Sequence, residues 1–214
     1  MMKAKAYIFD LDGTLVDSMT NGWIKMLREF LVKRNANFTP EVIKQGIALG
    51  LYGVAEDFKK RFSLLETVEE IVAEFKSVLR VKYETAIPQK SNVRETLTVL
   101  KERGISLNVL TASPHEFLDP STKRLGLYEL FDNVWSIEDF PTTKADPLIY
   151  KTVAEKLGLP IEECVMVDDS VAALKPAREA GMKTVGVYDE FSAGYEAEMR
   201  EIADKYIYDF EELL

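Results

Sequence analysis

The stretch AYIFDLDGT at residues 6–14 joins a short apolar run to two acidic residues and a glycine. An uninterrupted apolar run of this length is typical of a strand buried on both faces of a parallel sheet. Asp10 and Asp12 follow it two residues apart, so their side chains point to the same side. Two interpretations stay open at this point. Either one carboxylate attacks a substrate while the other moves protons, or Asp12 and Gly13 form a plain turn that Asp10 caps.

The rest of the chain alternates between apolar runs and helical patterns. Further strand candidates lie at residues 107–110, 134–135, 164–167 and 184–187. Helical patterns cover residues 93–103, 147–157 and 171–180, and a glycine follows each of them, as is usual just past the end of a helix. This alternation predicts the α/β class, with a Rossmann-like, doubly wound parallel sheet as the core.

One segment interrupts the alternation. Residues 17–86 carry helical patterns and no convincing strand, with one-sided apolar stripes such as Met26, Leu27, Phe30 and Leu31. We therefore expect residues 17–86 to form an inserted helical cap, and residues 1–16 together with 87–214 to form the core.

Composition and charge restrict the partners. The chain has 214 residues, with 27 Lys and Arg against 36 Asp and Glu, a formal charge of −9. Such a surface repels polyanions, so we expect neither nucleic acid nor a membrane as partner. No export signal or membrane-spanning run is evident, and the single cysteine, Cys164, forbids an internal disulfide. These features favour a cytoplasmic protein, and they carry no signal for an oligomeric state.

Three further groups of polar residues lie at or near the ends of predicted strands, where open parallel sheets bind ligands. The Thr111 hydroxyl and the backbone N–H groups that follow it, beginning with Ala112, can hold phosphate oxygens. Residues 113–116 also have the pattern of a helix capping box. Lys144 offers a fixed positive charge for a phosphate.

Asp168 and Asp169 form the last group. Two buried acids are costly unless a cation accompanies them. Mg²⁺ is bound through one or two carboxylates together with waters and a phosphate oxygen. Helix capping by Asp169 or Ser170 explains one residue of this group but not the acid pair.

Taken in order, these motifs resemble the haloacid dehalogenase (HAD) superfamily, in its branch of magnesium-dependent phosphatases and phosphomutases with a helical cap. The resemblance implies that Asp10 attacks phosphorus and that Asp12 is the general acid and base. It also implies two sets of ligands. The phosphoryl group is held by Thr111, Ala112 and Lys144. The Mg²⁺ ion is held by Asp10, Asp12 (through its carbonyl) and Asp169, with Asp168 in support.

We therefore expect a magnesium-dependent phosphatase that acts on a small phosphorylated metabolite, such as a sugar phosphate or a phosphoglycolate-like ester, through an aspartyl phosphate. One alternative is a sugar phosphomutase that resembles β-phosphoglucomutase. Its characteristic histidine and arginine are replaced here by Gly22 and by residues 53–56, which favours hydrolysis. An alternative of another class is a phospho-signalling or binding module without turnover.

Overall fold

The computed structural model describes residues 4–214. The chain divides into two compact units. One unit contains the chain up to Asp17 and again from Pro88 to the C-terminus, and Ser18–Ile87 form the other. No helix within residues 4–214 is both long and apolar enough to cross a membrane.

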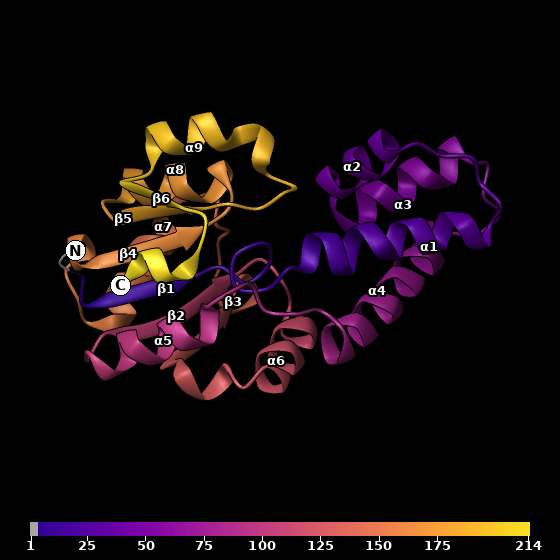
Figure 1. Ribbon diagram of the computed structural model, residues 1–214. Coiled ribbons are helices and arrows are strands. Elements are labelled where there is room, and N and C mark those ends of the chain that lie inside the picture. Colours follow the sequence, from indigo (N-terminus) through magenta and orange to yellow (C-terminus); the bar gives the residue numbers. More distant parts are fainter. Residues whose placement is uncertain (1–3) are drawn as a thin grey trace. The chain divides into compact units, whose positions relative to one another are not determined.

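The first unit is built on a parallel sheet (Figure 1). Its strands are β1 (Ala6–Phe9), β2 (Ser106–Thr111), β3 (Asn133–Ser136), β4 (Cys164–Asp168), β5 (Lys183–Val187) and β6 (Lys205–Ile207). Across the described residues they form one sheet in the order β3-β2-β1-β4-β5-β6, and each neighbouring pair is parallel. The first five coincide with the predicted apolar runs. Strand β6 was not predicted, because its three residues are too few to show a pattern.

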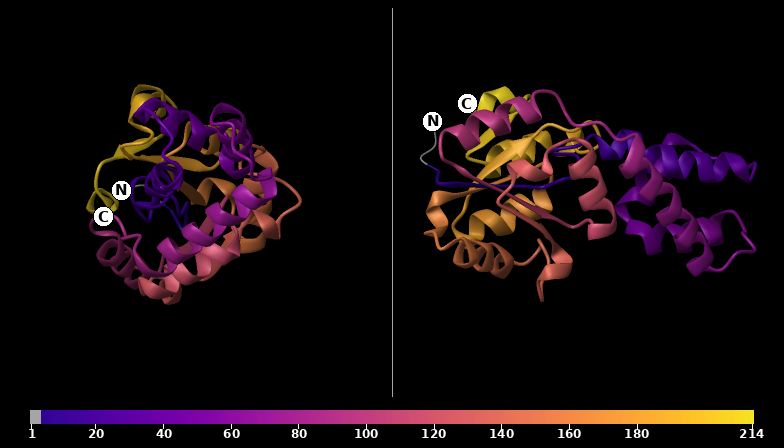
Figure 2. Two further views of the ribbon diagram at one scale, coloured as in Figure 1. Left: turned by 90° about the vertical axis from the view of Figure 1, so that its right-hand side faces the viewer. Right: turned by 90° about the horizontal axis from the view of Figure 1, so that it is seen from below.

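Helices cover both faces of this sheet, as the right-hand view of Figure 2 shows for α5 on one side and α7 and α8 on the other. The helices are α5 (Val93–Glu102), α6 (His115–Arg124), α7 (Pro147–Leu157), α8 (Val171–Ala180) and α9 (Glu196–Ile202). Ala6 and Ile8 of β1 belong to a core cluster that includes residues of α7, α8 and α9. On the opposite face, the ring of Phe9 lies against those of Phe131 and Phe210, with centroid distances of 6.3 and 6.1 Å. The predicted doubly wound α/β fold is thereby confirmed.

Short 3-10 turns complete the unit. They lie at Tyr128–Leu130, Ile137–Asp139, Ile161–Glu163, Ala193–Tyr195 and Phe210–Leu213.

The strand register decides where the polar residues emerge. Phe9 is paired with Val109 on one side and with Val167 on the other. Asp10, which comes directly after Phe9, therefore lies at the same sheet edge as the end of β2 and the end of β4. This is the carboxyl edge at which parallel sheets bind ligands.

The second unit is helical. A π-helical segment (Met19–Ile24) leads into α1 (Lys25–Lys33), which is followed by α2 (Pro40–Ala48), α3 (Gly50–Arg61) and α4 (Val68–Thr85). The rings of Phe30, Phe58 and Phe75 are buried at its centre, and the Phe30 and Phe75 rings meet edge to face with a centroid distance of 4.8 Å. Helix α4 begins with a capping box, in which Thr67 and Glu70 satisfy each other's backbone N–H groups.

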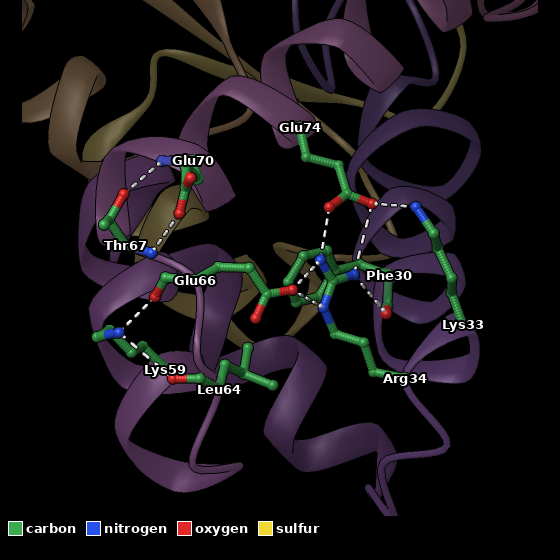
Figure 3. A network of polar contacts seen from close by, with 9 residues as sticks. All are labelled: Phe30, Lys33, Arg34, Lys59, Leu64, Glu66, Thr67, Glu70 and Glu74. Atoms are coloured by element: carbon green, nitrogen blue, oxygen red, sulfur yellow. Dashed lines mark hydrogen bonds and ion pairs between the residues drawn. The ribbon is translucent and has the colours of Figure 1, made fainter.

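A polar cluster covers one side of this apolar centre (Figure 3). The Arg34 guanidinium lies 3.6 Å from the centroid of the Phe30 ring and forms ion pairs of 2.8 Å with Glu66 and 2.6 Å with Glu74. These two ion pairs join the end of α1 to α4 and to the segment that precedes α4. Arg34 therefore has a structural role within the helical unit.

Candidate active site

Asp10 occupies the centre of the carboxyl edge of the sheet. Its backbone N–H donates to the carbonyl of Val167 with an N–O distance of 2.9 Å, which extends the ladder between β1 and β4 by one residue. Its side chain is only 8% exposed. The backbone of Asp10 is thus tied to β4, which holds the buried carboxylate in a fixed position.

Lys144 approaches from the loop that precedes α7. Its Nζ lies 2.6 Å from Oδ1 of Asp10 and 2.5 Å from Oδ2 of Asp168. Burial acts to lower the pKa of Lys144, but the charges of Asp10 and Asp168 outweigh it and raise that pKa above its usual value. Lys144 is therefore a permanent positive charge between two carboxylates that lie far from it in the sequence.

Asp168 is held from two sides. Besides the contact with Lys144, its Oδ1 accepts a hydrogen bond of 2.8 Å from the backbone N–H of Ser170. Burial nevertheless raises the pKa of Asp168 to about 6, opposed by Lys144 and assisted by the charge of Asp10. One ammonium serves two buried carboxylates here, so the pocket keeps an excess of negative charge.

Asp169 adds to this excess. It is 8% exposed, and its Oδ1 accepts a hydrogen bond of 3.2 Å from the Thr14 hydroxyl. Burial raises the pKa of Asp169 well above its usual range, and the charges of Asp168 and Asp10 raise it further. Gly13 packs directly against it with φ at +78°, and a Cβ on Gly13 would lie 2.6 Å from Oδ2 of Asp169.

The donor set fits a magnesium ion that is completed by its substrate. Within residues 4–214, no three side chains of His, Cys, Asp or Glu already converge as a cage for a metal. Mg²⁺ is usually bound through one or two carboxylates, with waters and phosphate oxygens in the remaining positions. Asp169, with its buried carboxylate beside the loop of Asp10, is a residue that could hold such an ion.

Asp12 has a different partner. The Ser113 hydroxyl donates to Oδ2 of Asp12 with an O–O distance of 2.5 Å, and the backbone N–H of Ser113 donates to the Thr111 hydroxyl oxygen at 3.1 Å. The predicted capping box at residues 113–116 is wrong, because Pro114 is the N-cap of α6 and its side chain makes no cap hydrogen bond. The Ser113 hydroxyl instead donates to Asp12. This bond joins the segment after β2 to the loop after β1.

Ser113, Thr14 and Tyr150 were not expected as site residues from the sequence. The buried Tyr150 of α7 contacts two backbone carbonyls with its hydroxyl, at 2.8 Å from that of Lys144 and 3.0 Å from that of Ala173. It fixes the backbone that carries Lys144. Only its place on the inner face of a predicted helix indicated that Tyr150 would be buried, and nothing in the sequence named its partners.

Most of the expected site residues lie at one edge of the sheet. Asp10, Lys144 and Asp168 are in direct contact, and Asp169 and Thr111 are buried at the same edge of the sheet. Asp12 is joined to this edge through Ser113, whereas Ala112 is exposed.

In this parallel sheet, Asp10 follows the first strand, and Asp168 and Asp169 stand at the end of the fourth. The sequence profile of the haloacid dehalogenase-like hydrolases matches residues 4–181. The chain belongs to this family. The expected HAD fold and the expected enzyme class, a hydrolase of phosphoric monoesters, are confirmed, whereas the match names no substrate.

Known proteins similar to this chain carry different names. Pyrophosphatase PpaX of Bacillus velezensis is 28% identical over 187 residues, which cover 86% of this chain and 83% of that protein. Phosphonoacetaldehyde hydrolase of Bacillus thuringiensis is 27% identical over 201 residues, covering 87% and 76%. A solved structure from Thermotoga maritima, provisionally named a beta-phosphoglucomutase, superimposes with a TM-score of 0.85 at 23% identity, covering 98% and 96%. The three names give three different activities, so they do not agree on a substrate.

Proposed function

We propose that this chain is a magnesium-dependent phosphatase that hydrolyses a small phosphomonoester through an aspartyl phosphate on Asp10. The observation that carries this proposal is the contact of Lys144 with both Asp10 and Asp168, with Asp169 buried next to them. A buried nucleophile lies beside a fixed cation, at an edge whose carboxylates outnumber that cation. This arrangement suits an anionic substrate that arrives with a dication.

The reaction then has two halves. An Asp10 oxygen attacks phosphorus, forming a bond to it while the bond from phosphorus to the ester oxygen breaks. Asp12 gives its proton to the departing oxygen. In the second half Asp12 takes a proton from water, the water oxygen attacks phosphorus, and the bond to Asp10 breaks to release phosphate. Lys144 already binds Oδ1 of Asp10, so we assign the attack to Oδ2.

The remaining residues hold the phosphoryl group. We assign its oxygens to the Thr111 hydroxyl, the backbone N–H of Ala112 and the Lys144 ammonium. The Mg²⁺ ion would be held by Asp10, the carbonyl of Asp12 and Asp169, while Asp168 supports the site through Lys144. The ion supplies the positive charge that stabilises the transferring phosphoryl group. These groups act mainly by position and charge, which is most of what phosphoryl transfer requires.

We propose that the helical insertion, expected at residues 17–86, acts as a cap that excludes water and selects the leaving group. This role fits a small metabolite, such as a sugar phosphate or a phosphoglycolate-like ester. The net charge of −9 disfavours polyanionic partners, and the buried single thiol of Cys164 fits a reducing, cytoplasmic environment.

Hydrolysis is favoured over phosphoryl transfer between sugar positions. Gly22, which stands where a mutase-like relative has its histidine, is buried, and a Cβ there would lie 2.9 Å from the Ile87 side chain. Val54 and Ala55, in the segment that lacks the mutase arginine, are fully buried in α3. Neither Gly22 nor residues 53–56 supply a histidine or an arginine, the two side chains that the mutase-like relative has at these places. Membership of a hydrolase family likewise favours turnover over a signalling module.

The test is release of inorganic phosphate from a panel of phosphorylated metabolites, with Mg²⁺ or with a chelator. We expect turnover only with Mg²⁺ and none in Asp10→Asn, because uncatalysed phosphomonoester hydrolysis is extremely slow. Asp57→Asn is the matched control, since Asp57 pairs with Arg61 on an exposed helix surface and should keep full activity. Near-normal turnover in Asp10→Asn would overturn the proposal.

A further inference from the structure

Lys90 and Asp189 form a largely buried ion pair that the proposed reaction does not use. Lys90 Nζ lies 2.9 Å from Oδ2 of Asp189 and donates to the carbonyl of Tyr188 at 2.7 Å. The two side chains are 17% and 4% exposed. Burying two charges is costly even when they are paired, so this pair calls for a reason beyond stability.

The sheet places Asp189 near the proposed metal ligand. Asp168, the last residue of β4, is paired with Gly186 of β5. Asp169 follows the first of these strands and Asp189 lies in the loop that follows the second. Both carboxylates therefore emerge at the carboxyl edge, from neighbouring strands.

Lys90 is attached to the loop that touches Asp169 from the other direction. Its backbone N–H donates to the carbonyl of Leu15 at 3.0 Å. The two residues before Leu15 are in contact with Asp169, since Thr14 donates to its carboxylate and Gly13 packs against it. One short loop thus separates the ion pair from the proposed metal ligand.

The Asp189 carboxylate is held rigidly. Its Oδ1 accepts a hydrogen bond of 2.9 Å from the backbone N–H of Phe191, and Lys90 binds its other oxygen. The Asp189 carboxylate is therefore fixed at the edge of the sheet from which Asp169 also emerges.

We propose that Asp189, oriented by Lys90, is a positioning carboxylate that strengthens the binding of a divalent cation at Asp169. The inference rests on the proposed function, because it assumes that Asp169 is a metal ligand. Asp189 acts through space on the site and not as a ligand. Lys90 keeps the carboxylate in place and moderates its field.

The test is calorimetric titration of MgCl₂ into the phosphate-free protein, without substrate. Replacing Asp189→Asn leaves the Lys90 charge unbalanced, so the Mg²⁺ dissociation constant should rise by about 10- to 100-fold, the range known for outer-shell partners of metal sites. Lys90→Met leaves the carboxylate unopposed, and its dissociation constant should be equal to or lower than that of the parent. The double variant Lys90→Met/Asp189→Asn should fall between the parent and Asp189→Asn.

This ranking of the Mg²⁺ dissociation constants separates an electrostatic role from a purely structural one. If the pair were only structural, replacing either Lys90 or Asp189 would weaken Mg²⁺ binding. Glu74→Gln is the matched control, since it removes one carboxylate from the largely buried Arg34 cluster of the helical unit and should leave Mg²⁺ affinity unchanged. If Asp189→Asn does not fold, the double variant, which leaves no unpaired charge, carries the test.

Two results would overturn the inference: unchanged Mg²⁺ affinity in Asp189→Asn and in the double variant, or equal weakening by Lys90→Met and Asp189→Asn. Failure of the proposed function is recognised separately. In that case the parent itself binds no Mg²⁺, or Asp169→Asn binds it as tightly as the parent.

Discussion

Replacing Gly13→Ala tests the geometry of the site through a single added carbon. Gly13 has φ at +78°, and the new Cβ would lie 2.6 Å from Oδ2 of Asp169. Ordinary contacts begin near 3.4 Å, so the Asp169 carboxylate must move by roughly 0.8 Å, the difference between these two distances. A misplacement of about 1 Å can cost about 100-fold in rate. We expect kcat/KM to fall by about that factor and the Mg²⁺ concentration for half-maximal activity to rise at least tenfold.

The control for this variant is Gly104→Ala. Gly104 has φ at +76° but no atom within 4 Å of the position of its Cβ, so the substitution adds the same backbone strain without the contact. Both variants should lose about 1–2 kcal/mol of stability from a left-handed alanine, measured by urea unfolding. Only Gly13→Ala should also lose Mg²⁺ affinity. Equal Mg²⁺ affinity in the two variants would refute the assignment of Asp169 as a ligand.

Three further outcomes are expected. Tyr150→Phe removes the single hydroxyl donor that lies between the carbonyls of Lys144 and Ala173 and should cost about 1–3 kcal/mol in urea unfolding; a loss below about 0.5 kcal/mol would contradict this. Addition of Mg²⁺ at about 100 times its dissociation constant should stabilise the parent by about 2.7 kcal/mol but not Asp169→Asn, as seen in thermal melts with and without chelator. Burial acts to lower the pKa of His115, but hydrogen bonds to Asp119 and Asp139 outweigh it and raise that pKa above 6.5. The folded pKa therefore exceeds the unfolded one, so this stabilisation is complete below pH 6.5 and lost as the pH rises through the folded value. The melting temperature of the parent should exceed that of His115→Gln at pH 6 by more than at pH 8, and a constant difference would argue against the ion pairs.

The apolar runs predicted five strands correctly. Strands β1, β2, β4 and β5 are largely buried, so their apolar runs give a clear signal, whereas β3 is half-buried and only Val134 and Trp135 marked it. Strand β6 (Lys205–Ile207) gave no such signal, since it has three residues and lies at the edge of the sheet. Its position depends on pairing with β5, which is a tertiary contact. The same holds for Ser113, whose local pattern indicates a helix cap. The nearby carboxylate of Asp12, 101 residues away in the sequence, competes for its hydroxyl.

The four aspartates of the site have two kinds of partner, an ammonium or a hydroxyl, and no local sequence motif indicates which aspartate has which. The ammonium of Lys144 is in contact with Asp10 and Asp168, whereas Asp12 and Asp169 accept hydrogen bonds from the hydroxyls of Ser113 and Thr14. A hydroxyl can rotate and either donate or accept, so it can follow a carboxylate that must gain and lose a proton, which a fixed cation would oppose. A hydroxyl also leaves the charge of Asp169 unbalanced, and a divalent cation can then neutralise it. The contacts of Lys144 with Asp10 and Asp168, and the bond from Ser113 to Asp12, separate the proposed nucleophile from the proposed proton carrier.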